Sequence, residues 1–121
     1  MSGAPQGPKR VLVIGLDGAT FDLLTPWSEQ GVLPNLKALV DRGVSGPLRS
    51  IFPPVTAPAW VTFQTGKNPG KHGIFEFLQH NAGSFELVPV NASMRDGLTI
   101  WEILTRAEKK VAILVFVSAD W

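Results

Sequence analysis

An apolar run over residues 11–16, ended by Asp17, is the feature that most constrains how this chain folds. The run is rich in valine, leucine and isoleucine and lacks the polar–apolar alternation of a strand that faces water. It therefore predicts a strand covered on both faces, as in a parallel sheet. It is far too short to span a membrane and too short for the apolar part of a secretion signal, so we expect a cytoplasmic protein.

Helices and further strands follow this run along the chain. Pro34 suits the first turn of a helix, and Gly43 suits the position after its last turn. Thr56 begins another helical pattern, which closes at Gly66. The expected helices cover residues 21–29, 34–42, 56–65 and 98–104, and the expected further strands cover residues 44–50, 85–90 and 111–117.

Strands that alternate with helices predict an α/β fold with a mostly parallel sheet flanked by helices. Residues 1–8 are rich in glycine and proline and predict a flexible N-terminal arm, so the domain covers residues 9–121. The run over residues 111–117 is apolar enough for an interior strand, yet the chain ends at Trp121. We therefore expect a sheet that is incomplete at its C-terminal side and that favours self-association through its open edge.

Composition excludes several classes of function. Apolar residues make up 45% of the chain and charged residues 17%, a balance typical of a globular domain rather than a disordered segment. The net charge of +1 offers no basic field for a nucleic acid polymer or an anionic membrane. The absence of cysteine rules out disulfides, thiolate catalysis and cysteine-based zinc sites, and 2 histidines are too few for a self-contained metal centre.

Asp17 directly follows the first predicted strand, at the sheet edge where open α/β folds bind ligands. Gly15 and Gly18 raise the alternative of a dinucleotide-binding loop, but Phe21 stands where a third glycine is needed. A carboxylate within such a loop would also repel a pyrophosphate unless a cation lay between them. Asp17 is therefore a candidate ligand of a divalent metal ion. A helix cap is the structural alternative, and position alone leaves both open.

Thr56 stands two residues before Pro58 at the start of a predicted helix. Threonine is a favoured N-cap and proline suits the first helical turn, so a structural cap explains both residues. The same position offers the free N–H groups and the positive dipole end that bind phosphate. A threonine hydroxyl is a weak nucleophile unless a base or a metal ion activates it, and a metal ion held by Asp17 would do so. Thr56 is thus a candidate nucleophile, with the cap as the alternative.

The predicted loop over residues 67–73 contains two lysines and His72. The Gly66-Lys67 pair resembles part of a phosphate-binding P-loop, but Asn68 replaces the hydroxyl residue of that motif and the glycine that should precede it is missing. We therefore expect solvated lysines here. A single histidine flanked by glycine-rich turns predicts a hydrogen-bonding loop residue rather than a metal ligand.

In their order and spacing, these motifs resemble the type I phosphodiesterase/nucleotide pyrophosphatase family of the alkaline phosphatase superfamily. The similarity covers residues 9–77 and implies an alkaline-phosphatase-like core. The segments that carry it are Val13-Ile14-Gly15-Leu16-Asp17-Gly18, Leu33-Pro34-Asn35-Leu36, Thr56-Ala57-Pro58, Thr65-Gly66 and His72-Gly73-Ile74.

The resemblance implies that Asp17 binds one of two zinc ions and that Thr56 is the nucleophile and also contacts a metal. It implies metal-dependent hydrolysis of a small phosphate ester through a phosphothreonyl intermediate. Ala59-Trp60 replaces the Asn-His pair frequent after the threonine motif, and no asparagine follows Ile74, so nucleotide substrates do not follow. The family's other metal ligands lie downstream of these motifs, so we expect a truncated N-terminal portion of the enzyme. The alternatives are a phosphotransferase or mutase of the same superfamily and a catalytically inactive fragment or binding module.

Overall fold

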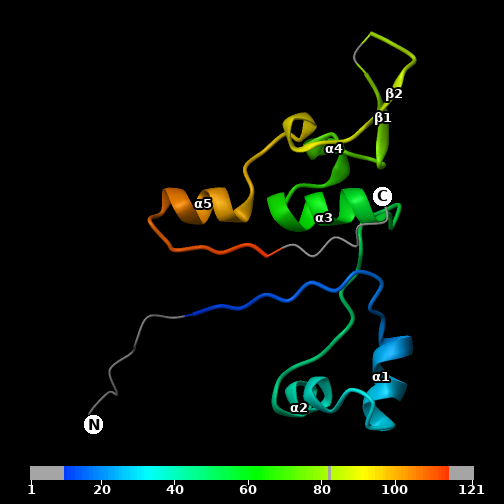
Figure 1. The fold of residues 1–121 in the computed structure, drawn as a ribbon, viewed down its shortest axis with the longest axis vertical. Coiled ribbons are helices and arrows are strands. Elements are labelled where there is room, and N and C mark those ends of the chain that lie inside the picture. Colours follow the sequence, from blue (N-terminus) through cyan, green and yellow to red (C-terminus); the bar gives the residue numbers. More distant parts are fainter. Residues whose placement is uncertain (1–9, 82, 115–121) are drawn as a thin grey trace. The chain divides into compact units, whose positions relative to one another are not determined.

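The structure, a computed structural model, describes residues 10–81 and 83–114. The chain forms two compact units, Met1–Leu48 and Arg49–Trp121, and each is described by itself. Helices dominate both units, and a short hairpin of strands belongs to the second unit (Figure 1). No helix in the described parts of the chain is long and apolar enough to cross a membrane.

The described part of the first unit contains α1 (Phe21–Glu29) and α2 (Pro34–Arg42), which contact each other. The chain turns between them at Gly31, whose φ of 77° is accessible to glycine at little cost. Proline occupies the first turn of α2, where its missing N–H is no loss. An ion pair of 3.0 Å between Lys37 and Asp41 joins successive turns of the same helix.

The second unit begins with α3 (Thr56–Thr65) and the short α4 (Pro69–His72). A glycine in the left-handed conformation follows each helix, Gly66 with φ of 66° and Gly73 with φ of 80°. Other residues adopt these angles only with strain, so the two glycines determine where the helices end.

A hairpin follows, formed by β1 (Leu78–His80) and β2 (Leu87–Pro89). The strands are antiparallel, and Gln79 lies opposite Val88 in the register. A single turn of 3₁₀ helix, η1 (Ala92–Met94), leads from the hairpin toward the last described helix.

The last described helix, α5 (Ile100–Arg106), contacts α3. It begins with a capping box in which Thr99 and Glu102 exchange hydrogen bonds between side chain and backbone. The buried residues of this unit lie in α3, in α4 and the turn after it, and at the N-cap of α5, and they form a small core. The most deeply buried large side chains among the described residues are Ile74, His72, Thr99 and Pro58.

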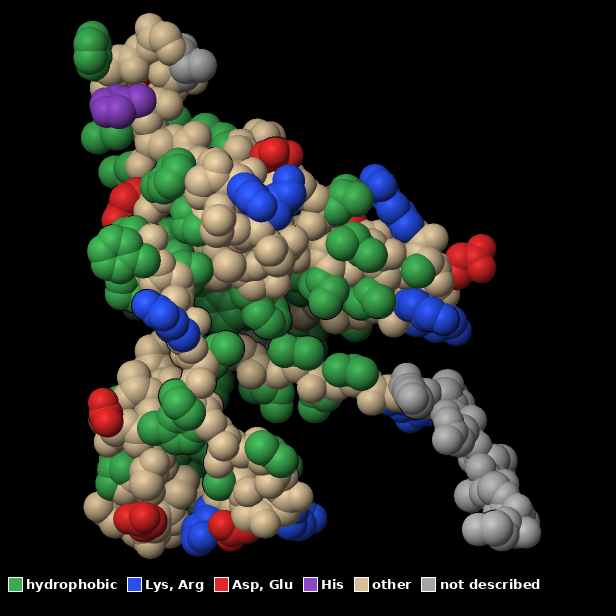
Figure 2. All heavy atoms as spheres, turned by 180° about the vertical axis from the view of Figure 1, so that it is seen from behind, with side chains coloured by type: hydrophobic (Ala, Val, Ile, Leu, Met, Phe, Trp, Pro, Cys, Tyr) green, Lys and Arg blue, Asp and Glu red, His purple; other side chains and the backbone are tan. Residues whose placement is uncertain are grey.

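The predicted parallel sheet does not form in the described residues, where the sheet is the two-stranded antiparallel hairpin. Residues 11–16 and 44–50 are not strands, and Val11 and Val44 are 85% and 103% exposed. Figure 2 shows hydrophobic side chains at the surface of each unit. A strand needs a hydrogen-bonded neighbour, and no described strand pairs with either segment. The mixture of helices and strands remains compatible with the α/β class.

The strand predicted over residues 85–90 is confirmed only in part, because pairing is limited to β2. Residues 111–114 form no strand, and residues 115–117 lie outside the described residues, as does the arm predicted over residues 1–8. The predicted helices are all confirmed, and the predicted ends of α2 and α3 agree with the structure. Helices depend on local hydrogen bonds, which explains why their prediction was more accurate.

Candidate active site

Thr56 is the first residue of α3 and is half-buried. The N-cap of this helix is Val55, in extended conformation with φ of −102° and ψ of 140°, so Thr56 does not fill the capping position. Its hydroxyl forms no hydrogen bond with any described residue. All buried side-chain polar atoms in the described residues have partners, so this unpaired hydroxyl reaches solvent. Thr56 therefore presents a free, accessible hydroxyl at the start of a helix.

Backbone groups at the start of α3 make this end of the helix electropositive. The N–H of Val55 donates to the carbonyl of Pro53 at 2.9 Å, whereas the N–H groups of Thr56 and Ala57 have no acceptor among the described residues. Pro58 has no N–H to offer. The first turn carries no acidic side chain that would neutralise the positive end of the helix dipole. The start of α3 thus carries two free N–H groups and an accessible hydroxyl, and a helix end of this kind stabilises an anion.

A shallow hollow of about 250 Å³ lies along the same helix. One face of α3 lines it with Ala57, Val61 and Gln64, and Ile74 and Arg95 line it from other segments. Ala57 directly follows Thr56, so the hollow reaches the first turn of α3. Its lining combines apolar residues with the polar residues Gln64, Asn91 and Arg95.

His72 is completely buried at the end of α4. Its Nδ1 accepts a hydrogen bond of 3.1 Å from the N–H of Ile74, so the ring proton resides on Nε2, which lies 3.0 Å from the hydroxyl of Thr62. Burial lowers the pKa of His72 and the charge of Lys67 adds to this, while hydrogen bonds with the backbone of Pro58 and of His72 itself act in the opposite direction. His72 is therefore a neutral residue whose hydrogen bonding agrees with the prediction, although it ends the short helix α4 instead of lying in a loop.

Lys67 differs from its prediction as a solvated residue. Its Nζ lies 3.4 Å from a carboxylate oxygen of Asp96, and its side chain is 35% exposed. The end of the same side chain covers Gly97 so closely that a Cβ on this glycine would lie 2.7 Å from the Lys67 Cε. Lys67 thus packs along the backbone near Gly97 with its charged end at the surface.

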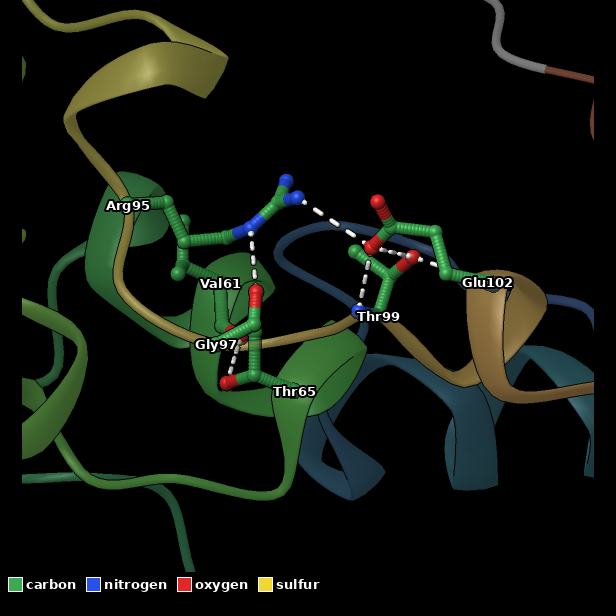
Figure 3. A network of polar contacts seen from close by, with 6 residues as sticks. All are labelled: Val61, Thr65, Arg95, Gly97, Thr99 and Glu102. Atoms are coloured by element: carbon green, nitrogen blue, oxygen red, sulfur yellow. Dashed lines mark hydrogen bonds and ion pairs between the residues drawn. The ribbon is translucent and has the colours of Figure 1, made fainter. Parts of the chain in front are cut away.

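A second polar network joins the segment before α5 to that helix (Figure 3). Arg95 donates from Nη2 to the Glu102 carboxylate and from Nε to the carbonyl of Gly97, both at 3.3 Å. The pKa of Glu102 is lowered, first by the Thr99 N–H and hydroxyl that donate to its carboxylate and then by the nearby Arg95 and Arg106 charges. These contacts direct Arg95 toward Glu102 and fix the start of α5.

Asp17 lies in the first unit, in a turn with Gly18, whose φ is 67°. The N-cap of the following helix is Thr20, so Asp17 is not a helix cap. Its carboxylate has no hydrogen bond or ion pair with the described residues, and it is exposed. Asp17 and Thr56 belong to different units, so the metal-mediated pairing of these two residues stays a prediction.

The described residues do not fit a complete two-metal centre by themselves. Within residues 10–81 and 83–114, no group of three or more histidine, aspartate or glutamate side chains comes together to hold a metal ion. His72 already uses both ring nitrogens in hydrogen bonds. Asp17 and Thr56 remain the predicted ligands, and a full set requires additional donors.

Comparison with known proteins identifies the family of this chain. A family model described as type I phosphodiesterase / nucleotide pyrophosphatase matches residues 11–121. The chain belongs to this family. The range that matches this phosphodiesterase family contains Asp17, Thr56 and His72, and membership confirms the resemblance carried by the ordered motifs.

An uncharacterized pyrophosphatase/phosphodiesterase of Schizosaccharomyces pombe is 43% identical to the chain over 65 residues. The alignment covers 53% of this chain but 13% of that relative, so most of the yeast protein has no counterpart in the comparison. No solved structure matches the chain at a significant level. The shared region thus represents a limited portion of a phosphodiesterase-family protein.

Proposed function

We propose that this protein hydrolyses phosphoric esters, with Thr56 as the nucleophile. The observation that supports this most directly is the accessible Thr56 hydroxyl, which has no described partner and stands at the electropositive start of α3. Membership of the phosphodiesterase family supports the same class of reaction. The match covers only 13% of the length of the Schizosaccharomyces pombe relative, so the activity of the whole protein is part of this proposal.

In this reaction the Thr56 oxygen attacks phosphorus and loses its proton, while the bond from phosphorus to the ester oxygen breaks and the alcohol leaves with a proton. Water then cleaves the phosphothreonyl bond, which releases phosphate or a monoester and restores the hydroxyl. The free N–H groups of Thr56 and Ala57 would stabilise negative charge on the phosphoryl oxygens. The hollow beside Ala57 would receive part of the organic group.

A divalent metal would supply charge neutralisation and a lower pKa for the attacking hydroxyl when bound. We retain Asp17 and Thr56 as its proposed ligands, and the family resemblance implies two zinc ions in the complete set. An alkaline-phosphatase-like fold of the whole protein belongs to the same proposal.

A binding module without catalysis is the second candidate. The observation in its favour is that the described residues bring together no group of three or more metal-ligating side chains. A phosphotransferase or mutase would use the same Thr56 chemistry but pass the phosphoryl group to another hydroxyl instead of water.

The test compares Thr56→Val with Thr65→Val, the same substitution at the two ends of α3. Both variants are made in the protein expressed from its complete gene. The substrates are bis(p-nitrophenyl) phosphate and p-nitrophenyl phosphate. We expect Thr56→Val to lower kcat by about a thousandfold or more, because the nucleophile is lost. The Thr65 hydroxyl donates to the Val61 carbonyl at 2.7 Å, away from the first turn, so Thr65→Val should keep its activity.

Acid-quenched wild-type protein should also contain phosphothreonine at position 56 by mass spectrometry. Unchanged hydrolysis by Thr56→Val would contradict the proposal. A wild-type protein that binds the esters without cleaving them would support the binding module, and transfer to an added alcohol in preference to water would support a phosphotransferase.

A further inference from the structure

α3 is held in the second unit by few buried side chains. Pro58 is its only buried residue, and the others are half-buried or exposed. An apolar contact surface of this kind permits small shifts of a helix, because such contacts are not directional. The orientation of α3 therefore depends strongly on its hydrogen bonds to neighbouring segments.

His72 supplies a buried polar link of this kind. Its Nε2 lies 3.0 Å from the Thr62 hydroxyl, in the middle of α3, and its ring also interacts with the backbone of Pro58, one turn earlier. Pro58 lies two residues after Thr56 in the same first turn. The imidazole thus contacts α3 near the end that carries the proposed nucleophile.

The other side of the ring is anchored as well. Nδ1 accepts from the N–H of Ile74 at 3.1 Å, and the carbonyl of His72 accepts from the N–H of Asp96 at 3.0 Å. Ile74 is 1% exposed, so this anchor lies in the small core. The ring can satisfy both neighbours only as the neutral Nε2–H tautomer, since Nδ1 must remain an acceptor.

We propose that His72 is a positioning residue for catalysis: its neutral imidazole fixes α3 against the turn after α4 and thereby sets the position of the Thr56 hydroxyl. This inference rests on the proposed function of Thr56. His72 itself touches neither the substrate nor a metal, because both ring nitrogens are already used within the protein. A small displacement of a nucleophile is costly in rate, which gives such an anchor a kinetic effect.

The test removes the link from the α3 side, since replacing the buried histidine risks unfolding the unit. Thr62→Val keeps the β-branched shape and removes the hydroxyl, whereas Thr62→Ser keeps the hydroxyl. Thr65→Val is the matched control, because it removes another hydroxyl of α3 whose bond stays within the helix and its C-terminal turn. Circular dichroism verifies that each variant is folded.

We expect Thr62→Val to lower kcat by about 10- to 100-fold with KM within about twofold of wild type, as for residues that orient a reacting group. Thr62→Ser should restore most of kcat, and Thr65→Val should leave it unchanged. A folded Thr62→Val variant with wild-type kcat would overturn the inference, and so would an equal loss of kcat in Thr65→Val.

Nitrogen-15 NMR of the imidazole provides a readout that does not depend on turnover. The wild-type protein should show His72 as the Nε2–H tautomer, and Thr62→Val should shift the Nε2 resonance. A dominant Nδ1–H tautomer in the wild-type protein would contradict the inference.

The failures of the two proposals are distinguishable. Loss of activity in Thr56→Val together with full activity in Thr62→Val rejects the positioning role and leaves the nucleophile in place. Full activity in Thr56→Val rejects the nucleophile and removes the basis for any positioning of it.

Discussion

Thr99→Ala tests how much the capping box contributes to the second unit. The Thr99 side chain is fully buried, and its hydroxyl accepts from the Glu102 N–H at 3.3 Å and donates to the Glu102 carboxylate at 2.7 Å. Replacing a threonine N-cap with alanine typically costs about 0.5–2 kcal/mol. Because this residue is buried and makes both bonds, we expect a loss of about 1–2 kcal/mol in the free energy of unfolding.

Urea-induced unfolding followed by circular dichroism measures this loss, with two controls. Thr99→Ser keeps the hydroxyl and should cost about 0.5 kcal/mol or less, since serine is as good an N-cap as threonine. Thr105→Ala changes an exposed threonine of the same helix and should alter stability by about 0.5 kcal/mol at most. Equal losses for Thr99→Ala and Thr105→Ala would refute the reasoning, as would a Thr99→Ser variant as unstable as Thr99→Ala.

Three further predictions follow from individual residues. Wild type should be more stable than Glu102→Gln at neutral pH, and the difference should vanish as the pH falls through the lowered pKa of Glu102, which urea titrations across acid pH would detect. Because the pKa of His72 is lowered on folding, the unfolded state binds its proton first, so the free energy of unfolding should fall as the pH drops below about 6.5; urea titrations at a series of pH values measure this, and a free energy that does not fall would contradict it. Gly66→Ala, at a φ of 66°, should cost about 1 kcal/mol by thermal or urea unfolding, whereas Gly70→Ala, whose added Cβ meets only Asn68 Oδ1 at 3.6 Å, should cost less; equal costs would argue against the strain.

The helices were predictable because their signals are local. Pro34 marks the start of α2, and Gly66 marks the end of α3 through its left-handed conformation. The capping box was also visible in the sequence, because Thr99 and Glu102 stand three residues apart within the apolar stretch over residues 98–104, but the helix prediction did not rest on it.

The sheet was not predictable in the same way, because pairing depends on segments distant in sequence. Residues 11–16 have the composition of a buried strand, yet the described residues contain no strand paired with them. β1 and β2 form because a short connection brings them together as a hairpin. Of the segments whose composition suits a strand, only residues 85–90 pair in part, and their partner β1 was not predicted as a strand.

The same difference between local signals and contacts distant in sequence applies to the candidate site. The location of Thr56 at the start of a helix followed from Pro58, but its free hydroxyl did not, because threonine at such a position predicts a cap as readily as a nucleophile. The burial of His72 could not be read from the glycines around it, since its partner Thr62 lies ten residues earlier on α3.

Because the core of the second unit is small, these polar contacts contribute much to holding α3 in place. Ile74 is the large hydrophobic residue buried there among the described residues, while the other deeply buried large side chains are His72, Thr99 and Pro58. Apolar burial alone would hold α3 loosely, whereas hydrogen bonds at 3.0 and 3.1 Å from one ring define its position against the turn after α4. Thr62→Val, which conserves volume but removes the hydroxyl that pairs with His72, should therefore disturb the start of α3 more than a conservative change among its exposed apolar residues. The position of the Thr56 hydroxyl then depends on the buried polar contacts, and the residues that make these contacts are the ones to vary first.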